Sequence, residues 1–140
     1  MARPKGKVLR GDPLSHVTNP NHRLLLRDAF KGKLVAIELQ EDLAVCRYRR
    51  GKFTTPEASW FSPKPYPSPA DARCKLALPN SNMAEKMDRF KIPKRTIILW
   101  GKAASQVGVT GFGPYATGGG EQIYLPDPSK ARRGRGGAES

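Results

Sequence analysis

Prolines and glycines interrupt this chain so often that its regular elements must be short. The sequence has 13 prolines and 14 glycines among 140 residues, and both residue types disfavour the interior of a helix. Prolines at positions 63, 65, 67 and 69 give one segment an extended conformation that cannot be helical. This composition favours short strands and many turns over a helix bundle, and the length suits a single core. We therefore predict a small, loop-rich α+β domain.

Apolar runs rich in β-branched residues indicate the strands. Predicted strands cover residues 43–48, 58–62 and 96–100. Arg47 interrupts the apolar run of the first, and Gly101 is expected to end the third. The run at residues 34–39 is strand or helix, because its periodicity does not decide between them.

Three short helices are predicted from capping residues. Residues 23–30 form the first, with Asn21 as its candidate N-cap. Residues 69–78 form the second, which begins on a proline and an acidic residue, both suited to the exposed N–H groups of a first turn. A third is expected to begin at residue 80 or 81 and to run to residue 89.

Three consecutive glycines at 118–120 lead directly into a last predicted strand, in which polar and apolar residues alternate. Glycine lets a ligand or a neighbouring backbone approach closely. On the strand, Glu121 and Ile123 point to one face while Gln122 and Tyr124 point to the other. Only one of the two polar groups can therefore face a cleft, unless a bulge intervenes. The alternative interpretation is a hairpin loop with an exposed polar pair.

The chain is strongly basic, with 25 Lys and Arg against 12 Asp and Glu and a formal charge of +13. Part of this charge lies at the two ends. Residues 1–12 are predicted to be a mobile arm and contribute +3. Residues 130–140, after a polar stretch that begins at Asp127, are predicted to be a disordered Arg/Gly-rich tail and also contribute +3. Residues 13–129 therefore remain basic without their tails. Such a field attracts phosphate-rich partners, although a basic surface without a dedicated partner is the alternative.

The cysteines and the hydropathy pattern exclude several other classes. Cys46 and Cys74 have no metal-ligand spacing around them, so no zinc site is expected. Two free thiols are preferred, and a disulfide between them is left open. No apolar run is long enough to cross a bilayer, so membrane insertion is not expected, and the basic N-terminus lacks the apolar segment of a signal peptide.

The order of several short motifs resembles a known family. The motifs are Arg47, residues 59–62 (Ser-Trp-Phe-Ser), 71–73 (Asp-Ala-Arg), 76–79 (Leu-Ala-Leu-Pro), 92–93 (Ile-Pro), 101–104 (Gly-Lys-Ala-Ala) and 118–122 (Gly-Gly-Gly-Glu-Gln). Their order is similar to that of the toxin domains that end bacterial polymorphic effectors. Those domains have the ADP-ribosyltransferase fold or the related NAD-glycohydrolase form of the tuberculosis necrotizing toxin. The resemblance covers residues 43–126.

The resemblance implies a split β-sheet over residues 13–129 that holds NAD in a cleft between two small sheets. The residues it assigns to NAD binding are Arg47, Ser59, Trp60, Phe61, Ser62, Gly119 and Gly120. It makes Gln122 the catalytic counterpart and places Glu121 at a variable position, from which it would act on an acceptor. Cleavage of the nicotinamide–ribose bond passes through an oxocarbenium-like cation, so a group that holds the ribose hydroxyls lowers the barrier.

Two classes of function follow. The first is an NAD-consuming effector toxin that transfers ADP-ribose to a target, with RNA as the first acceptor to test, or that hydrolyses NAD. The second is a non-catalytic module that binds nucleic acid through its tails and aromatic residues. For the toxin, the resemblance also implies a cognate immunity protein, secretion as part of a larger effector and action in the cytoplasm of a target cell.

Overall fold

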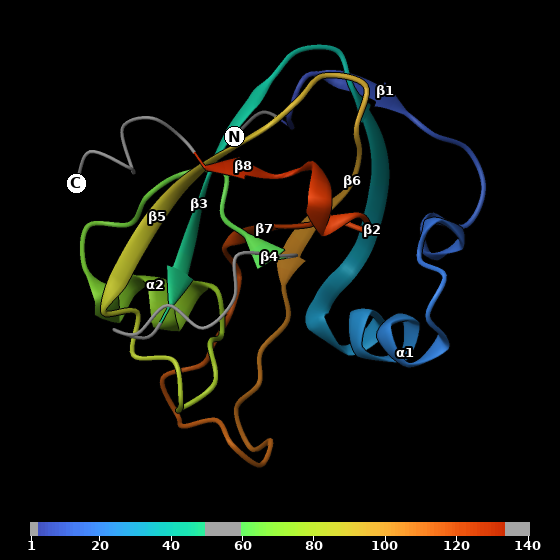
Figure 1. Cartoon of the computed structure of the whole chain (residues 1–140). Coiled ribbons are helices and arrows are strands. Elements are labelled where there is room, and N and C mark those ends of the chain that lie inside the picture. The colour runs from blue at the N-terminus through green and yellow to red at the C-terminus, as the bar shows by residue number, and fades with distance from the viewer. Residues whose placement is uncertain (1–2, 50–59, 134–140) are drawn as a thin grey trace.

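Two antiparallel sheets form the centre of the molecule (Figure 1). The computed structural model describes residues 3–49 and 60–133. The larger sheet has the order β1-β2-β6-β7-β4, with β1 at Gly6–Val8, β2 at Phe30–Leu39, β6 at Ile97–Ala103, β7 at Glu121–Tyr124 and β4 at Trp60–Phe61. The smaller sheet has the order β3-β5-β8, with β3 at Leu43–Arg49, β5 at Lys86–Ile92 and β8 at Arg132–Arg133. With its short helices, the chain has the predicted α+β fold.

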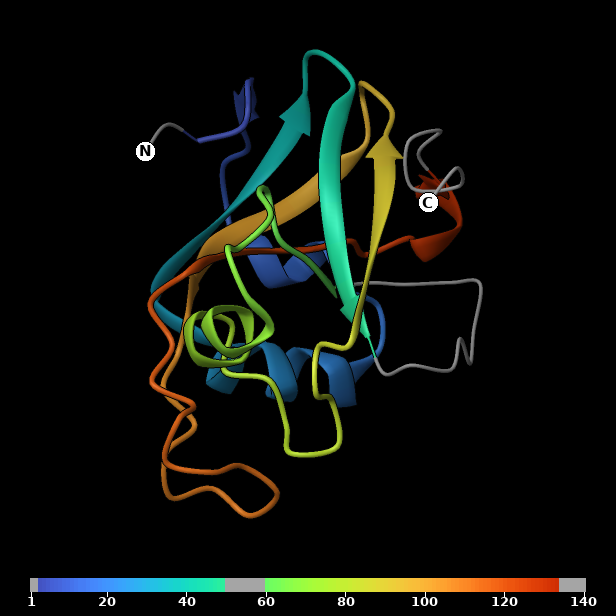
Figure 2. The ribbon, with the colours of Figure 1, turned by 90° about the vertical axis from the view of Figure 1, so that its left-hand side faces the viewer.

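The chain passes back and forth between the two sheets. The turn at residues 40–42 leads from β2 to β3, and residues 93–96 lead from β5 to β6. Figure 2 shows these two turns at one end of the molecule, with β3 and β5 side by side. A third link joins the sheets directly, because Cys46 and Ser62 exchange two backbone hydrogen bonds of 2.8 Å. Ser62, the residue that follows β4, is therefore paired with Cys46 of β3, and their side chains lie on the same face.

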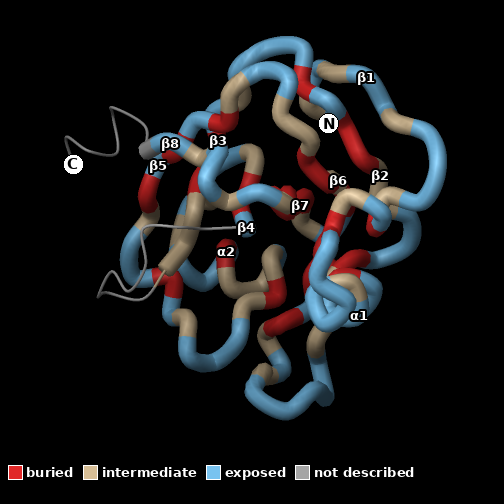
Figure 3. Tube along the Cα trace, turned by 45° about the vertical axis from the view of Figure 1, so that its right-hand side comes forward, coloured by how far each residue is buried: buried red, intermediate tan, exposed pale blue. Residues whose placement is uncertain are grey.

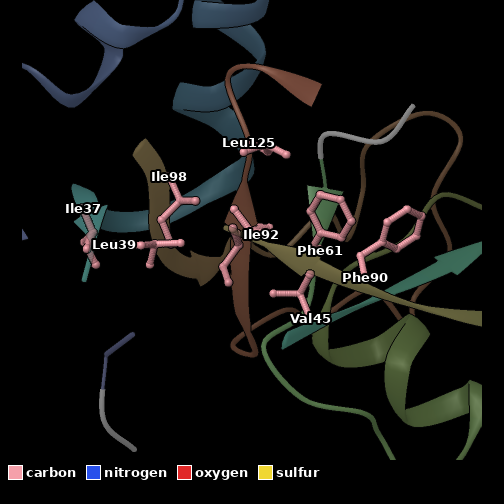
Figure 4. Packing of buried hydrophobic residues seen from close by; sticks show 9 residues of the cluster. Ile37, Leu39, Val45, Phe61, Phe90, Ile92, Ile98 and Leu125 are labelled. Atoms are coloured by element: carbon pink, nitrogen blue, oxygen red, sulfur yellow. The ribbon is translucent and has the colours of Figure 1, made fainter. Parts of the chain in front are cut away.

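The main core lies between the two sheets (Figure 4). The larger sheet and the chain just after it contribute Ile37, Leu39, Phe61, Ile98, Ile123 and Leu125, and the smaller sheet contributes Val45, Phe90 and Ile92. All nine side chains are buried. A second cluster covers the opposite face of the larger sheet, where Leu26 of α1 packs near Phe30, Leu99 and Tyr124.

Neighbouring residues of the inner strands enter different cores. On β6, Ile98 packs into the main core while Leu99 packs into the second cluster, and on β7 Ile123 and Tyr124 divide in the same way. This two-sided burial, visible in Figure 3 as red segments on the inner strands, explains the unbroken apolar runs of the sequence. It also makes residues 34–39 a strand.

Helix α1 covers Pro20–Ala29, so it begins earlier than the predicted residue 23. Its N-cap is Asn19 and not Asn21: the Asn19 side chain accepts a hydrogen bond of 2.9 Å from the Asn21 N–H. Pro20 takes the first helical position, which requires no N–H donor. Helix α2 covers Pro69–Lys75 and begins as predicted, with Ser68 as its cap. It ends before residue 78. Single 3-10 turns lie at Pro13–His16 and Pro128–Lys130.

The helix predicted to run to residue 89 is wrong, because residues 86–92 form strand β5. Asp88, Phe90 and Ile92 of this strand are buried, while Arg89 and Lys91 are exposed. The alternation is that of a half-buried strand, but a buried aspartate occupies one of its apolar positions. Arg49 of β3 pairs with Asp88 at 2.5 Å, which allows the carboxylate to be buried.

Three further predictions about the chain ends and strand limits need correction. The arm predicted over residues 1–12 contains β1, whose three residues pair with β2. The polar segment after Asp127 contains a 3-10 turn and β8, which pairs with β5; residues 134–140 of the predicted tail lie outside the described residues. Gly101 does not end its strand, because β6 continues to Ala103. A Cβ at Gly101 would lie 2.7 Å from the Phe30 ring, so this glycine serves close packing.

Candidate functional site

A cavity of about 820 Å³ lies where α1, the two sheets and the long connection after β6 meet. Its walls combine residues far apart in sequence. They are His22, Leu25, Leu26, Asp28 and Ala29 of α1; residues 46–49 of β3; Trp60, Phe61 and Ser62; residues 76–79 and Asn82; Ala104, Gln106, Val109 and Phe112; and Gln122 and Tyr124 of β7. The volume is that of a typical small-molecule site.

Strand β7 turns Gln122 and Tyr124 toward this cavity. The Gln122 side chain is buried, and its Nε2 donates a hydrogen bond of 2.7 Å to the Ala29 carbonyl at the end of α1. This bond fixes the carboxamide nitrogen toward the helix. Two residues further on, the Tyr124 hydroxyl lies 3.3 Å from Nδ1 of His22, and both side chains line the cavity. The first turn of α1, through His22, and its last residue, Ala29, are thus both joined to strand β7 by hydrogen bonds along one wall.

Glu121 lies on the other face of β7 and does not line the cavity. Its Oε1 accepts a hydrogen bond of 2.9 Å from the indole N–H of Trp100, which lies on the neighbouring strand β6. The carboxylate is buried there, and a hydrogen bond to a charged acceptor compensates part of its lost hydration. The two-residue alternation expected from the sequence therefore separates the neighbouring polar residues, with only Gln122 on the cavity side.

Arg47 lines the cavity from the smaller sheet, whereas Gln122 lines it from the larger sheet. It is half-buried and stands in register with Asp88 on β5. Arg49, two residues along the same strand, also lines the cavity and forms the ion pair with Asp88. Two arginine residues thus belong to one wall, and the planar guanidinium group can donate two hydrogen bonds to the oxygens of a pyrophosphate.

The short strand β4 brings its aromatic residues to the cavity. Trp60 is 39% exposed and stacks edge-on against Tyr124, with ring centroids 4.9 Å apart. The Phe61 ring lies in the main core, with its centroid 5.3 Å from that of Phe90, and the residue also forms part of the cavity wall. The Ser62 hydroxyl donates to the Lys64 carbonyl at 2.5 Å, so it stabilises the local turn. Ser59 lies outside the described residues.

The glycine loop, residues 118–120, is held by backbone hydrogen bonds to α2 and to the end of β6. The N–H groups of Gly118, Gly119 and Gly120 donate to the carbonyls of Cys74, Ala103 and Lys75, at 2.8, 2.8 and 2.9 Å. Neither Gly119 nor Gly120 lines the cavity, so their contact with a cofactor stays a prediction. The loop instead sets the position of β7 by fastening its start to α2 and to the end of β6.

Gly118→Ala should destabilise the fold by about 3 kcal/mol or more, because Gly118 has a φ of +75° and its added Cβ would lie 2.6 Å from the Ala103 carbonyl oxygen. Gly119→Ala is the matched control. Gly119 has a φ of +94° with open space around it, so only backbone strain of about 1 kcal/mol is expected. Urea unfolding of both variants measures the difference, and equal losses would contradict the close contact at Gly118.

The cysteines offer no nucleophile to this site. Both are free thiols, as preferred from the sequence. Cys46 lines the cavity, but burial raises the pKa of its thiol above the ordinary value, although the nearby Arg89 acts in the opposite direction. A protonated thiol is a poor nucleophile.

Among the residues that the structure describes, no group of three His, Cys, Asp or Glu side chains could hold a metal. The helices in the described part of the chain are too short to span a membrane.

Several wall residues carry no signal in the sequence. His22, Asp28 and Gln106 line the cavity, and the Gln106 Nε2 donates to the Asp28 carbonyl at 3.1 Å. Asp28 supplies the one carboxylate among the described wall residues. Because His22 and Asp28 lie more than 90 positions before β7 and Gln106 lies in a loop without a motif, neither spacing nor periodicity could have grouped them.

Comparisons with known proteins identify the fold alone. No protein-family model matches the sequence, and a search of curated proteins gives no match. Among solved structures, a chain in the structure of Tse6 in complex with Tsi6 is similar, with a TM-score of 0.59 and 12% sequence identity. The similarity covers 85% of this chain and 85% of that chain. The chain therefore shares its fold with that structure over most of its length.

Proposed function

We propose that this chain is an effector toxin that cleaves NAD at the bond between nicotinamide and ribose. One observation carries the proposal: Arg47 and Gln122, which belong to separate sequence motifs and to different sheets, line the same cavity. The motifs are those through which the sequence resembles NAD-consuming toxin domains with the ADP-ribosyltransferase fold. The fold shared with the Tse6–Tsi6 structure adds support.

The cavity has the size and the groups that NAD requires. A volume of about 820 Å³ lies in the upper part of the range of small-molecule and cofactor pockets, about 300–1,000 Å³, and so leaves room for a ligand as large as NAD. Arg47 and Arg49 offer cationic donors to the pyrophosphate, and the exposed Trp60 offers an aromatic face to a planar ring. Leu25, Leu26 and Phe112 add apolar surface to the walls.

In the proposed reaction, the C–N bond between ribose and nicotinamide breaks and its electron pair leaves with nicotinamide. The ribose then carries oxocarbenium character. Gln122 would hold the ribose hydroxyls through its carboxamide, whose orientation the hydrogen bond to Ala29 fixes. Asp28 would add negative potential at the wall, which favours a cationic transition state. Attack by water on the ribose carbon, with loss of a proton, completes the hydrolysis.

Water is the favoured acceptor because Glu121 does not line the cavity and bonds to Trp100. In the resembled family, glutamine after the glycines is found in the NAD-glycohydrolase form. Transfer of ADP-ribose to another molecule is the second candidate. It is supported by the basic charge of the chain, because a small anionic substrate does not require so large a field.

A protein partner and a place of action complete the proposal. Tse6 was solved in complex with a second protein, Tsi6, and we propose a cognate immunity protein for this chain as well. Secretion as part of a larger effector, with action in the cytoplasm of a target cell, is the corresponding proposal for its location.

The test is incubation of the purified chain with NAD labelled in the nicotinamide ring and, in a parallel sample, with NAD labelled in the adenosine half, followed by chromatography. Released nicotinamide together with free ADP-ribose would support hydrolysis. Released nicotinamide with label from the adenosine half on added RNA, DNA or protein would support transfer. Intact NAD after incubation at high enzyme concentration, with the folded state verified by circular dichroism, would overturn NAD cleavage.

Glu121→Gln should change NAD cleavage by less than about threefold, because the carboxylate lies on the face of β7 away from the cavity. A glutamine can still accept the Trp100 hydrogen bond, but as a neutral acceptor it should stabilise the fold by about 1 kcal/mol less. Nicotinamide release and urea unfolding measure the two effects. A large loss of cleavage with unchanged stability would make Glu121 the catalytic residue.

A further inference from the structure

A row of cations lies on the outer face of the smaller sheet. Arg89 and Lys91 of β5 are exposed and alternate with the buried residues of that strand, and Arg132 of β8 is exposed beside them. We call Arg89, Lys91 and Arg132 the basic stripe. Since residues two apart on a strand are about 7 Å apart and neighbouring strands about 5 Å apart, the three charged groups can reach adjacent positions of one extended ligand.

The arrangement is unfavourable for the isolated fold. Lys91 and Arg132 are direct cross-strand partners, and like charges in that position are destabilising. Within the described parts of β3, β5 and β8, no acidic side chain shares this face. Asp42 and Glu85 flank the sheet in the preceding segments, and the Asp42 carboxylate accepts the Lys94 N–H at 2.9 Å. The stripe thus presents a positive potential to solvent.

The stripe runs into the cavity along one continuous face. Arg89 is the cross-strand partner of Cys46, and Cys46 forms a β-bridge with Ser62, the residue that follows β4. Cys46, Tyr48 and Ser62 all line the cavity. The side chains of paired residues lie on the same side of a sheet, so a ligand on the basic stripe would extend directly to the wall of the cavity.

Two aromatic rings stand at this junction. Tyr48 and Tyr66 pack with their ring centroids 6.3 Å apart, and the exposed Lys64 ammonium lies 5.8 Å from the Tyr66 centroid. The Tyr48 hydroxyl accepts the Tyr66 N–H at 2.7 Å, which holds both rings in place. Cations beside aromatic rings are the combination with which proteins bind single-stranded nucleic acid, through phosphates and stacked bases.

We infer that the basic stripe binds a single strand of nucleic acid, which runs over the smaller sheet toward the cavity. The backbone phosphates contact Arg89, Lys91 and Arg132, and a base reaches the Tyr48–Tyr66 pair. The binding does not depend on NAD cleavage. The role of the bound strand rests on the proposed function: the strand would be the acceptor of ADP-ribose in the transfer reaction.

The test is fluorescence anisotropy with a labelled oligouridylate of about 12 nucleotides, a length within the usual site sizes, and with oligothymidylate of equal length. The triple variant Arg89→Gln, Lys91→Gln, Arg132→Gln should lose at least about tenfold in affinity. The slope of log K against log salt should fall by about 2, because each phosphate contact contributes about 0.7. Equal binding of both oligonucleotides would place recognition on the shared backbone and stacking, and tighter binding of the uridylate would make RNA the ligand.

The control is a triple variant with the same loss of charge on the larger sheet, Lys31→Gln, Lys33→Gln, Lys102→Gln, since these lysines are also exposed. Its affinity should fall by less than about threefold. Equal losses in the two triple variants would overturn the inference in favour of a general charge effect. Unchanged affinity in the stripe variant, or equally tight binding of a polyglutamate of the same length, would also overturn it. Nicotinamide release from NAD alone is measured separately, so either proposal can fail without the other.

Discussion

Arg47→Ala should abolish detectable NAD consumption while the protein remains folded. If the guanidinium makes two charge-assisted hydrogen bonds to the pyrophosphate, each contributing about 2 kcal/mol, their loss lowers kcat/KM by about a thousandfold. The side chain is half-buried at a cavity wall and not part of the main core, so the melting temperature should change little. Nicotinamide release and thermal unfolding are measured on the same sample.

Two further variants separate the causes of this loss. Arg47→Lys keeps the charge but not the planar fork, so it should recover only part of the activity. Arg27→Ala removes an exposed cation from α1 that does not line the cavity, and it should cleave NAD normally. Full turnover in Arg47→Ala would remove Arg47 from the site.

Gln122→Ala should lower nicotinamide release by about a hundredfold or more, which is the usual effect of removing one well-placed group that stabilises a charged transition state. The loss should be in kcat more than in KM, because the group acts on charge that develops during the reaction. The substitution also removes the hydrogen bond to Ala29, with an expected cost of about 1 kcal/mol in stability.

Gln106→Ala is the matched control for that structural effect. Gln106 also lines the cavity, and its carboxamide also donates to a carbonyl at the end of α1, that of Asp28. Its replacement removes an equivalent bond but no group from the glycine motif, so cleavage should fall by less than about fivefold. Similar losses in the two variants would mean that the attachment of α1, and not the Gln122 carboxamide, supports catalysis.

Two strands could be predicted from the sequence because each contains a run of apolar residues. Residues 43–48 and 96–100 were expected to be strands; β3 covers the first range, and β6 begins one residue later than expected, at Ile97. The alternation after the glycines correctly placed Gln122 and Glu121 on opposite faces. These features depend on local pattern and on the two-residue period of a strand.

Strand β5 could not be predicted in the same way. Its alternation is interrupted by Asp88, which is buried because Arg49 pairs with it from a strand 39 positions away. A charged residue can occupy a buried position of an alternating pattern when a distant residue pairs with it, and the local sequence does not show that partner. Strands β1 and β8 were missed for another reason, since two or three residues are too few to show a period.

The cavity itself was only partly predictable. Five residues from separate motifs line it, namely Arg47, Trp60, Phe61, Ser62 and Gln122, whereas Gly119 and Gly120 do not; their roles toward NAD stay predictions. The contribution of α1 depends on how the helix packs on the larger sheet. His22 meets Tyr124 only because Leu26 on the same helix enters the second cluster, and no local pattern contains that information.

The path of the chain between the sheets also determines how the molecule can fold. From β2 to β8 the chain changes sheet repeatedly, so neither sheet can be completed from one continuous piece of sequence. Pairings between distant segments form slowly, because the chain entropy must be lost before the contacts are gained. The two sheets should consequently fold and unfold in a single cooperative step. A cavity with walls from both sheets then exists only in the complete fold, and a partly folded chain has none.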